Sequence, residues 1–101
     1  MKISELIEEL QEAEKNGINV VKIGNAYIDK VTCNGIDSTV DLKLKFTSGL
    51  SLRELIKELQ SMRVGYGSDI EVTCIGFDIA VVLPLVDICD IKCGNLHPFQ
   101  K

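Results

Sequence analysis

The heptapeptide ELIEELQ at residues 5–11 returns almost unchanged as ELIKELQ at residues 54–60. Both copies place leucine and isoleucine on one side of a helix and charged residues on the other, which predicts two amphipathic helices facing a core. Leu, Ile, Glu and Gln are also common helix formers. The repeated letters therefore indicate either an internal duplication or two helices that share only their composition.

The residues that flank each copy predict where the helices begin and end. Asn16-Gly17 follows the first copy and is a common helix stop, because glycine accepts the left-handed conformation found there. Ser51 and Glu54 form a capping box at the start of the second helix. Lys2 stands at the equivalent position of the first copy, so the first helix is expected to begin more loosely.

Three strand patterns follow each helix. One of them alternates apolar residues with Asp41, Lys43 and Lys45, which is typical of a strand with one solvated face. Glycine and asparagine separate the segments, as expected of turns. The predicted strands are residues 18–23, 26–33 and 40–46 in the first half, and 69–75, 77–83 and 86–93 in the second.

The predicted architecture is α+β, with a single domain over residues 1–101. Two helix-plus-three-strand (αβββ) units, residues 1–48 and 49–96, pack antiparallel sheet against both helices, and residues 97–101 form a tail. Matching residues 31–35 to 91–95 requires an offset of 60, whereas the helices match at 49. Eleven additional residues are therefore expected in the second half, around residues 75–85.

The charge balance limits the function classes. Eleven basic residues against fifteen acidic ones give a formal net charge of −4, which makes nucleic acid an unlikely partner because phosphate binding needs a positive surface. The longest apolar run has eight residues, far below the roughly 20 that a membrane-spanning helix needs. Glutamates interrupt the N-terminal segment where a signal peptide would be apolar. We expect a cytoplasmic protein without a membrane partner.

The four cysteines and the single histidine offer little chemistry. In a reducing cytosol the cysteines are expected to be free thiols. Cys89, Cys93 and His97 are the weak candidates for metal ligands, but positions 89 and 93 of a strand lie roughly 13 Å apart, too far for one metal ion. A nucleophile paired with a base cannot be identified around His97. The prediction is a protein without enzymatic activity, cofactor or metal.

The stretch IAVVLPLV at residues 79–86 loses the alternation of a half-buried strand. Either this strand is covered on both faces, or it presents one face to another protein. Pro84 predicts an edge or a bulge, because proline cannot donate to a strand ladder. Binding to a protein partner or to further copies of the chain is the leading hypothesis. The candidate interface residues are Ile79, Val81, Val82, Leu83 and Leu85.

A small-ligand module is the alternative function. Lys22, Tyr27 and Tyr66 could line a pocket between the two units and bind a nucleotide or metabolite. Sequence alone leaves both hypotheses open.

The opening MKISELIEEL, followed by a turn and strand-rich sequence, resembles small proteins encoded by phages and prophages. Such proteins often begin with this type of helix and continue with two or three strands. The resemblance implies a role found in some of them, the inhibition of bacterial defence systems by binding a protein or sequestering a ligand. The chain departs from the commonest form by carrying two units and by lacking a Pro-Asp turn after the helix.

Overall fold

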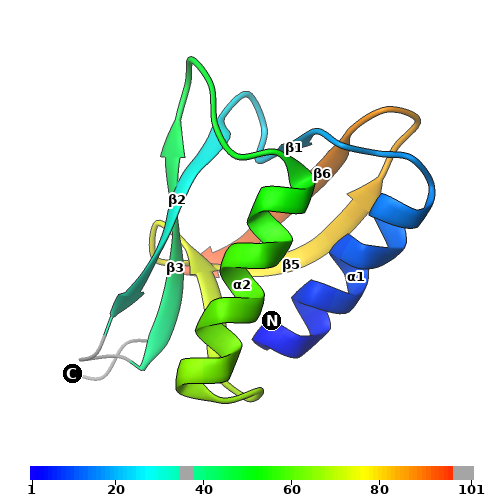
Figure 1. Cartoon of the computed structure of the whole chain (residues 1–101). Helices are drawn as coiled ribbons and strands as arrows, with labels where there is room; N and C mark the ends of the chain where they lie inside the picture. The colour runs from blue at the N-terminus through cyan, green and yellow to red at the C-terminus, as the bar shows by residue number, and fades with distance from the viewer. Residues whose placement is uncertain (35–37, 97–101) are drawn as a thin grey trace.

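Figure 1 shows the computed structural model, which describes residues 1–34 and 38–96. Its elements follow the order α-β-β-β-α-β-β-β, and the α+β class is confirmed. The first half contains α1 (Ile3–Lys15), β1 (Val21–Lys22), β2 (Tyr27–Asn34) and β3 (Thr39–Lys45), and the second contains α2 (Leu52–Tyr66), β4 (Glu71–Cys74), β5 (Phe77–Pro84) and β6 (Cys89–Leu96).

All six strands belong to one mixed sheet in the order β1-β6-β5-β4-β3-β2. The prediction of purely antiparallel sheet is wrong, because β1 pairs with β6 and β3 pairs with β4 in parallel. Helix α2 carries the chain back between β3 and β4, and a crossover of this kind permits parallel pairing. The sheet curls until β1 and β2, at opposite ends of the order, meet at a bridge between Ile23 and Ala26. It is therefore nearly barrel-shaped.

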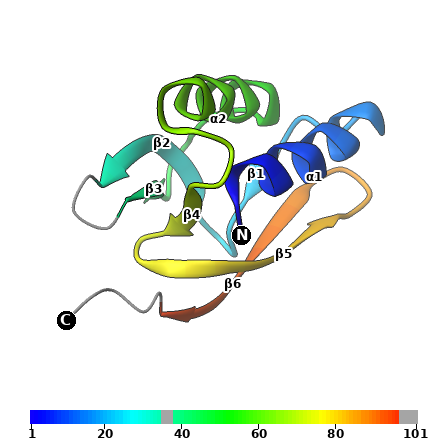
Figure 2. The same ribbon diagram turned by 90° about the horizontal axis from the view of Figure 1, so that it is seen from below.

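Both helices lie side by side on one face of this sheet, as Figure 2 shows from below. The apolar stripes predicted from the repeated heptapeptides form the centre of the core, and each fully buried leucine or isoleucine contributes about 1.5–3 kcal/mol. The buried helical residues are Ile3, Leu6, Ile7, Leu10 and Ala13 from α1, and Leu52, Leu55, Ile56 and Leu59 from α2.

The two helices begin in different ways. Ser51 Oγ accepts a hydrogen bond from the Glu54 amide at 3.1 Å, and the Glu54 carboxylate accepts one from the Ser51 amide at 2.8 Å, which confirms the capping box. At α1 the Glu5 carboxylate accepts a hydrogen bond from the Lys2 amide at 3.0 Å, but the side chain of Lys2 caps no backbone amide. In addition, the Ile3 amide donates to the Ile70 carbonyl at 2.9 Å. A bond to a distant segment thus anchors the helix that was expected to begin loosely.

The second helix and its strands start 49 or 50 residues after the first helix and its strands. The paired starting positions are 3 and 52, 21 and 71, 27 and 77, and 39 and 89. The expected insertion of eleven residues is wrong. The alignment that required it matched the end of β2 with the end of β6, which occupy different positions within their halves.

Asp41 on β3 is buried, although the alternation of its strand predicted a solvated position. Its carboxylate accepts hydrogen bonds from Thr73 Oγ1 at 2.6 Å and from the Gly76 amide at 3.1 Å, and it pairs with Lys43 Nζ at 2.9 Å. Together these contacts clamp β3 to the turn between β4 and β5. Ile75 in that turn has a φ of 43°, which is costly for a β-branched residue.

Two opposing effects set the pKa of Asp41. Burial raises it, but the hydrogen bonds from Thr73 and Lys43, the Gly76 amide and the charge of Lys43 together lower it below its ordinary value of 3.8. A carboxylate whose pKa is lower in the folded than in the unfolded state stabilises the fold above the unfolded value. That contribution is lost as the pH falls through the folded value.

We predict that Asp41→Asn lowers the free energy of unfolding at pH 7 by about 1–2 kcal/mol. The neutral amide replaces the charged acceptor of these hydrogen bonds and no longer pairs with the charge of Lys43. The stability of the native protein should also fall more steeply between about pH 5 and pH 2 than that of the variant. Urea unfolding across this pH range measures both effects. Equal pH slopes for the two proteins would contradict the role assigned to Asp41.

Gly49 fits a position that has no room for a side chain. The Leu50 amide donates to the Ile28 carbonyl at 2.8 Å and draws the segment before α2 against β2. A Cβ atom on Gly49 would lie 2.6 Å from Tyr27 Cβ and would also overlap the Ile28 carbonyl. Gly65, inside α2, has nothing within 4 Å of the same position.

These two glycines give a matched pair of substitutions. Gly49→Ala should destabilise the protein by about 1–3 kcal/mol through backbone overlap. Gly65→Ala should stabilise it by up to about 1 kcal/mol, because alanine favours the helix. Thermal unfolding of both variants tests this, and destabilisation of similar size at the two sites would count against the packing described here.

Candidate functional site

A bulge in β5 explains why residues 79–86 do not alternate. The register of β5 against β6 shifts on either side of Ile79. The additional residue lets Ile79 and Val82 both face the core, where each is 4% exposed. Val81 and Leu83 face outward. The bulge lies before Val81 and not at Pro84, which pairs with Cys89 on one side and, among the described residues, has no paired strand on the other, in agreement with the edge position expected for this proline.

The structure divides the predicted interface residues into two groups. Ile79 and Val82 belong to the core, so they are not available to a partner. Val81, Leu83 and Leu85 are 42%, 37% and 51% exposed. These three residues and Val86 are called the β5 patch below.

Exposed apolar side chains concentrate around this patch. Of the ten large hydrophobic residues identified as exposed, six lie between positions 75 and 86. Val81 lies opposite Lys92 and Leu83 lies opposite Asp90 on β6. Lys92 and Asp90 pair with each other at 2.9 Å, so the apolar stripe runs beside an ion pair. The outward side of this hairpin is turned away from both helices in Figure 2.

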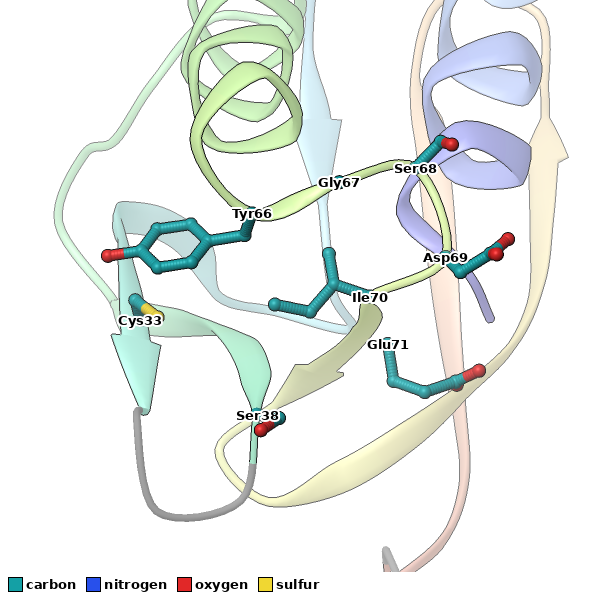
Figure 3. Close-up of a pocket in the computed structure, with 8 residues that line it drawn as sticks. All are labelled: Cys33, Ser38, Tyr66, Gly67, Ser68, Asp69, Ile70 and Glu71. Atoms are coloured by element: carbon teal, nitrogen blue, oxygen red, sulfur yellow. The ribbon is translucent and has the colours of Figure 1, made fainter.

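A pocket of about 620 Å³ lies at the other end of the sheet, where α2 ends and β4 begins. Figure 3 shows Tyr66 lying beside Cys33, with Ile70 pointing toward them and Asp69 and Glu71 pointing away. The lining residues are Cys33, Ser38, Tyr66, Gly67, Ser68, Asp69, Ile70 and Glu71. They come from the β2–β3 hairpin and from the connection between α2 and β4.

Several polar groups of this pocket already interact with other residues. Hydrogen bonding and the electrostatic interaction with the Cys33 side chain raise the pKa of Tyr66 above its ordinary value of 10.0. Glu71 pairs with the amino group of Met1 at 3.0 Å, and Asp69 lies 3.7 Å from Lys2 Nζ. The pocket thus combines an aromatic ring, a thiol and hydroxyl groups with two carboxylates at its side.

The predicted ligand-binding residues do not form one site. Lys22 Nζ lies 4.7 Å from the centre of the Tyr27 ring, a cation–π contact. Both belong near the start of α2, because neighbouring Val20 bridges to Ser51. Tyr66 ends the same helix, about 20 Å away along its axis. The pocket lining contains Tyr66 but neither Lys22 nor Tyr27.

The residues predicted as weak metal-ligand candidates do not form one site either. Cys89 is buried in the core, and burial raises its pKa to about 11. Cys93 is exposed, and His97 lies outside the described residues. The four cysteines are free thiols. Within residues 1–34 and 38–96, no group of three or more His, Cys, Asp or Glu side chains could hold a metal ion.

Sequence reasoning missed most of the pocket. Cys33 lies on β2 and Ser38 directly precedes β3, whereas Gly67 and Ile70 follow a helix 29 to 37 positions later. No local pattern connects them, because only the parallel pairing of β3 with β4 brings the two segments together.

Neither described helix is long and apolar enough to cross a membrane. No protein-family model, curated protein or solved structure matches the chain.

Proposed function

We propose that this protein is a small non-enzymatic interaction protein that binds a protein partner through the β5 patch. The concentration of exposed apolar side chains between residues 75 and 86 carries this proposal. An apolar patch beside polar residues marks an interaction site, since contact with a partner removes it from water. Its residues are aliphatic, and aliphatic side chains bind by burial but supply no acid, base or nucleophile.

The position of the patch also supports binding. Ile79 and Val82 anchor β5 in the core, so the outward side chains are held on a rigid strand. Rigid presentation lowers the entropy cost of binding. The cytoplasmic location and the phage-type origin stay predictions.

Replacing Val81 and Leu83 together by serine should remove at least about half of the fluorescence that an uncharged solvatochromic dye gains on binding the protein, because the apolar stripe is interrupted. Val64→Ser is the matched control. Val64 is 89% exposed but lies on α2, away from the β5 patch. Dye titration measures the effect, and circular dichroism verifies the fold. Equal dye binding by the native protein and the double variant would refute the β5 patch as a binding surface.

A second candidate function is the binding of a small ligand beside Tyr66. The pocket volume of about 620 Å³ falls in the range of natural ligand sites, about 300–1,000 Å³. The described lining includes no lysine or arginine, and its two carboxylates already pair with Lys2 and the Met1 amino group. A lining without a basic side chain offers no partner for a phosphate group, so it favours uncharged ligands over nucleotides and narrows the ligand class expected from the sequence.

The pocket predicts a distinction between nucleosides and nucleotides. A purine nucleoside that stacks on Tyr66 should raise the melting temperature by a few degrees at ten times its dissociation constant. The corresponding triphosphate should have no effect, because no basic side chain in the lining compensates for the lost hydration of its phosphates. Tyr66→Ala should abolish the shift, and a thermal-shift titration measures all three. A shift with the triphosphate alone would contradict the proposed ligand chemistry.

We also propose that the two halves are αβββ units that arose by duplication. The constant spacing of 49 or 50 residues between their elements supports this. The long-range contacts repeat as well. Lys2 before α1 bridges to Glu71 of the second half, and Ser51 before α2 bridges to Val20 of the first half. Shared helix composition alone gives no reason for such reciprocal contacts.

A further inference from the structure

One edge of β5 has no strand beside it over most of its length. β5 pairs with β6 from Phe77 to Pro84, but with β4 only at Phe77 and Asp78. Within residues 1–34 and 38–96, no strand or isolated bridge pairs with residues 79–84 on the side away from β6.

The direction of the backbone groups along this edge follows from the hairpin. The Leu85 amide donates across the hairpin to the Ile88 carbonyl at 2.9 Å, so residue 85 faces β6. The register is constant from Val81 to Pro84, and backbone groups alternate in direction along an antiparallel strand. Val82 and Pro84 therefore direct their backbone groups toward the free edge. Pro84 fits this position because its missing N–H removes no bond to β6.

The edges of β2 and β5 are protected differently. β2, at the end of the strand order, carries Asp29 and Lys30 at a bulge, and charges and bulges discourage the addition of another strand. Residues 79–86 contain no charged residue. β5 has a bulge before Val81, but its edge from Val81 to Pro84 is regular.

We propose that the free edge of β5 binds β5 of a second copy of the chain, in antiparallel orientation about Val82. This inference rests on the proposed function, because it specifies the partner that contacts Val81 and Leu83 of the β5 patch. A two-fold arrangement needs a self-complementary surface. An uncharged, apolar strand meets this requirement.

Between Val81 and Leu83, where the strand is regular, the proposed register pairs residues whose numbers sum to 164. The Val82 residues of the two copies exchange two hydrogen bonds. Val81 of one copy lies opposite Leu83 of the other, which makes one apolar stripe across both. Residues 79–86 carry no charge, so no like charges face each other across this stretch. A single strand pair is a small interface, so the dimer is expected to be weak.

Sedimentation equilibrium of the full chain over a range of concentrations tests the proposal. The native protein should show a monomer–dimer equilibrium, and Val81→Lys or Leu83→Lys should each raise the dissociation constant at least about tenfold. The double variant Val81→Lys/Leu83→Glu should restore it to within about threefold of the native value. In the proposed register, each introduced lysine lies opposite the glutamate of the other copy.

Val64→Lys adds the same charge on α2 and should leave the dissociation constant unchanged. A native protein that stays monomeric at about 0.5 mM would overturn the self-pairing. Failure of the double variant to recover, when both single variants are folded and weakened, would overturn the register. If the serine variant loses dye binding while the native protein is monomeric, the proposed function stands and the self-pairing falls. If dye binding is unchanged, the proposed function itself falls.

Discussion

The parallel pairing of β1 with β6 and of β3 with β4 is the constraint on which the rest of the fold depends. Each pair joins a strand of the first half to a strand of the second. A half of about 50 residues buries little apolar surface by itself. Once these pairs form, both halves contribute to one curved sheet, and α1 and α2 find a common face on which to pack.

The pairing of the N-terminal segment with β4 explains why, in the described part of the chain, one edge of β5 lacks a neighbouring strand over most of its length. The Val72 amide donates to the Met1 carbonyl at 2.9 Å, and Lys2 bridges to Glu71. The segment before α1 thus pairs with β4, and β5 pairs with β4 only at two positions beside the turn. The N-terminal segment therefore pairs with the part of β4 along which β5 would otherwise continue.

The turn between β4 and β5 shows how a polar group supports this arrangement. Only a tight turn can reverse the chain between two such closely following strands, and Ile75 accepts an unfavourable φ of 43° there. The Asp41 carboxylate accepts a hydrogen bond from the Gly76 amide in the same turn. A buried charge is costly unless it is paired and hydrogen-bonded, and Asp41 meets both conditions. The β5 patch begins a few residues further along the strand that this turn positions.

The sequence by itself determined the helices, the approximate strands and the α+β class, because hydrophobic periodicity and turn residues specify the local conformation of the backbone. The stripes of the repeated heptapeptides and the Ser51–Glu54 capping box are confirmed. It also identified residues 79–86 as unusual, but could not separate Ile79 and Val82 in the core from Val81 and Leu83 outside. The tertiary structure decided that division through the bulge, just as it decided the parallel pairs, the burial of Asp41 and the pocket beside Tyr66. These features depend on contacts between residues far apart in the chain. Such contacts stabilise the fold without producing a periodic pattern in the sequence of either segment, so neither segment alone predicts them.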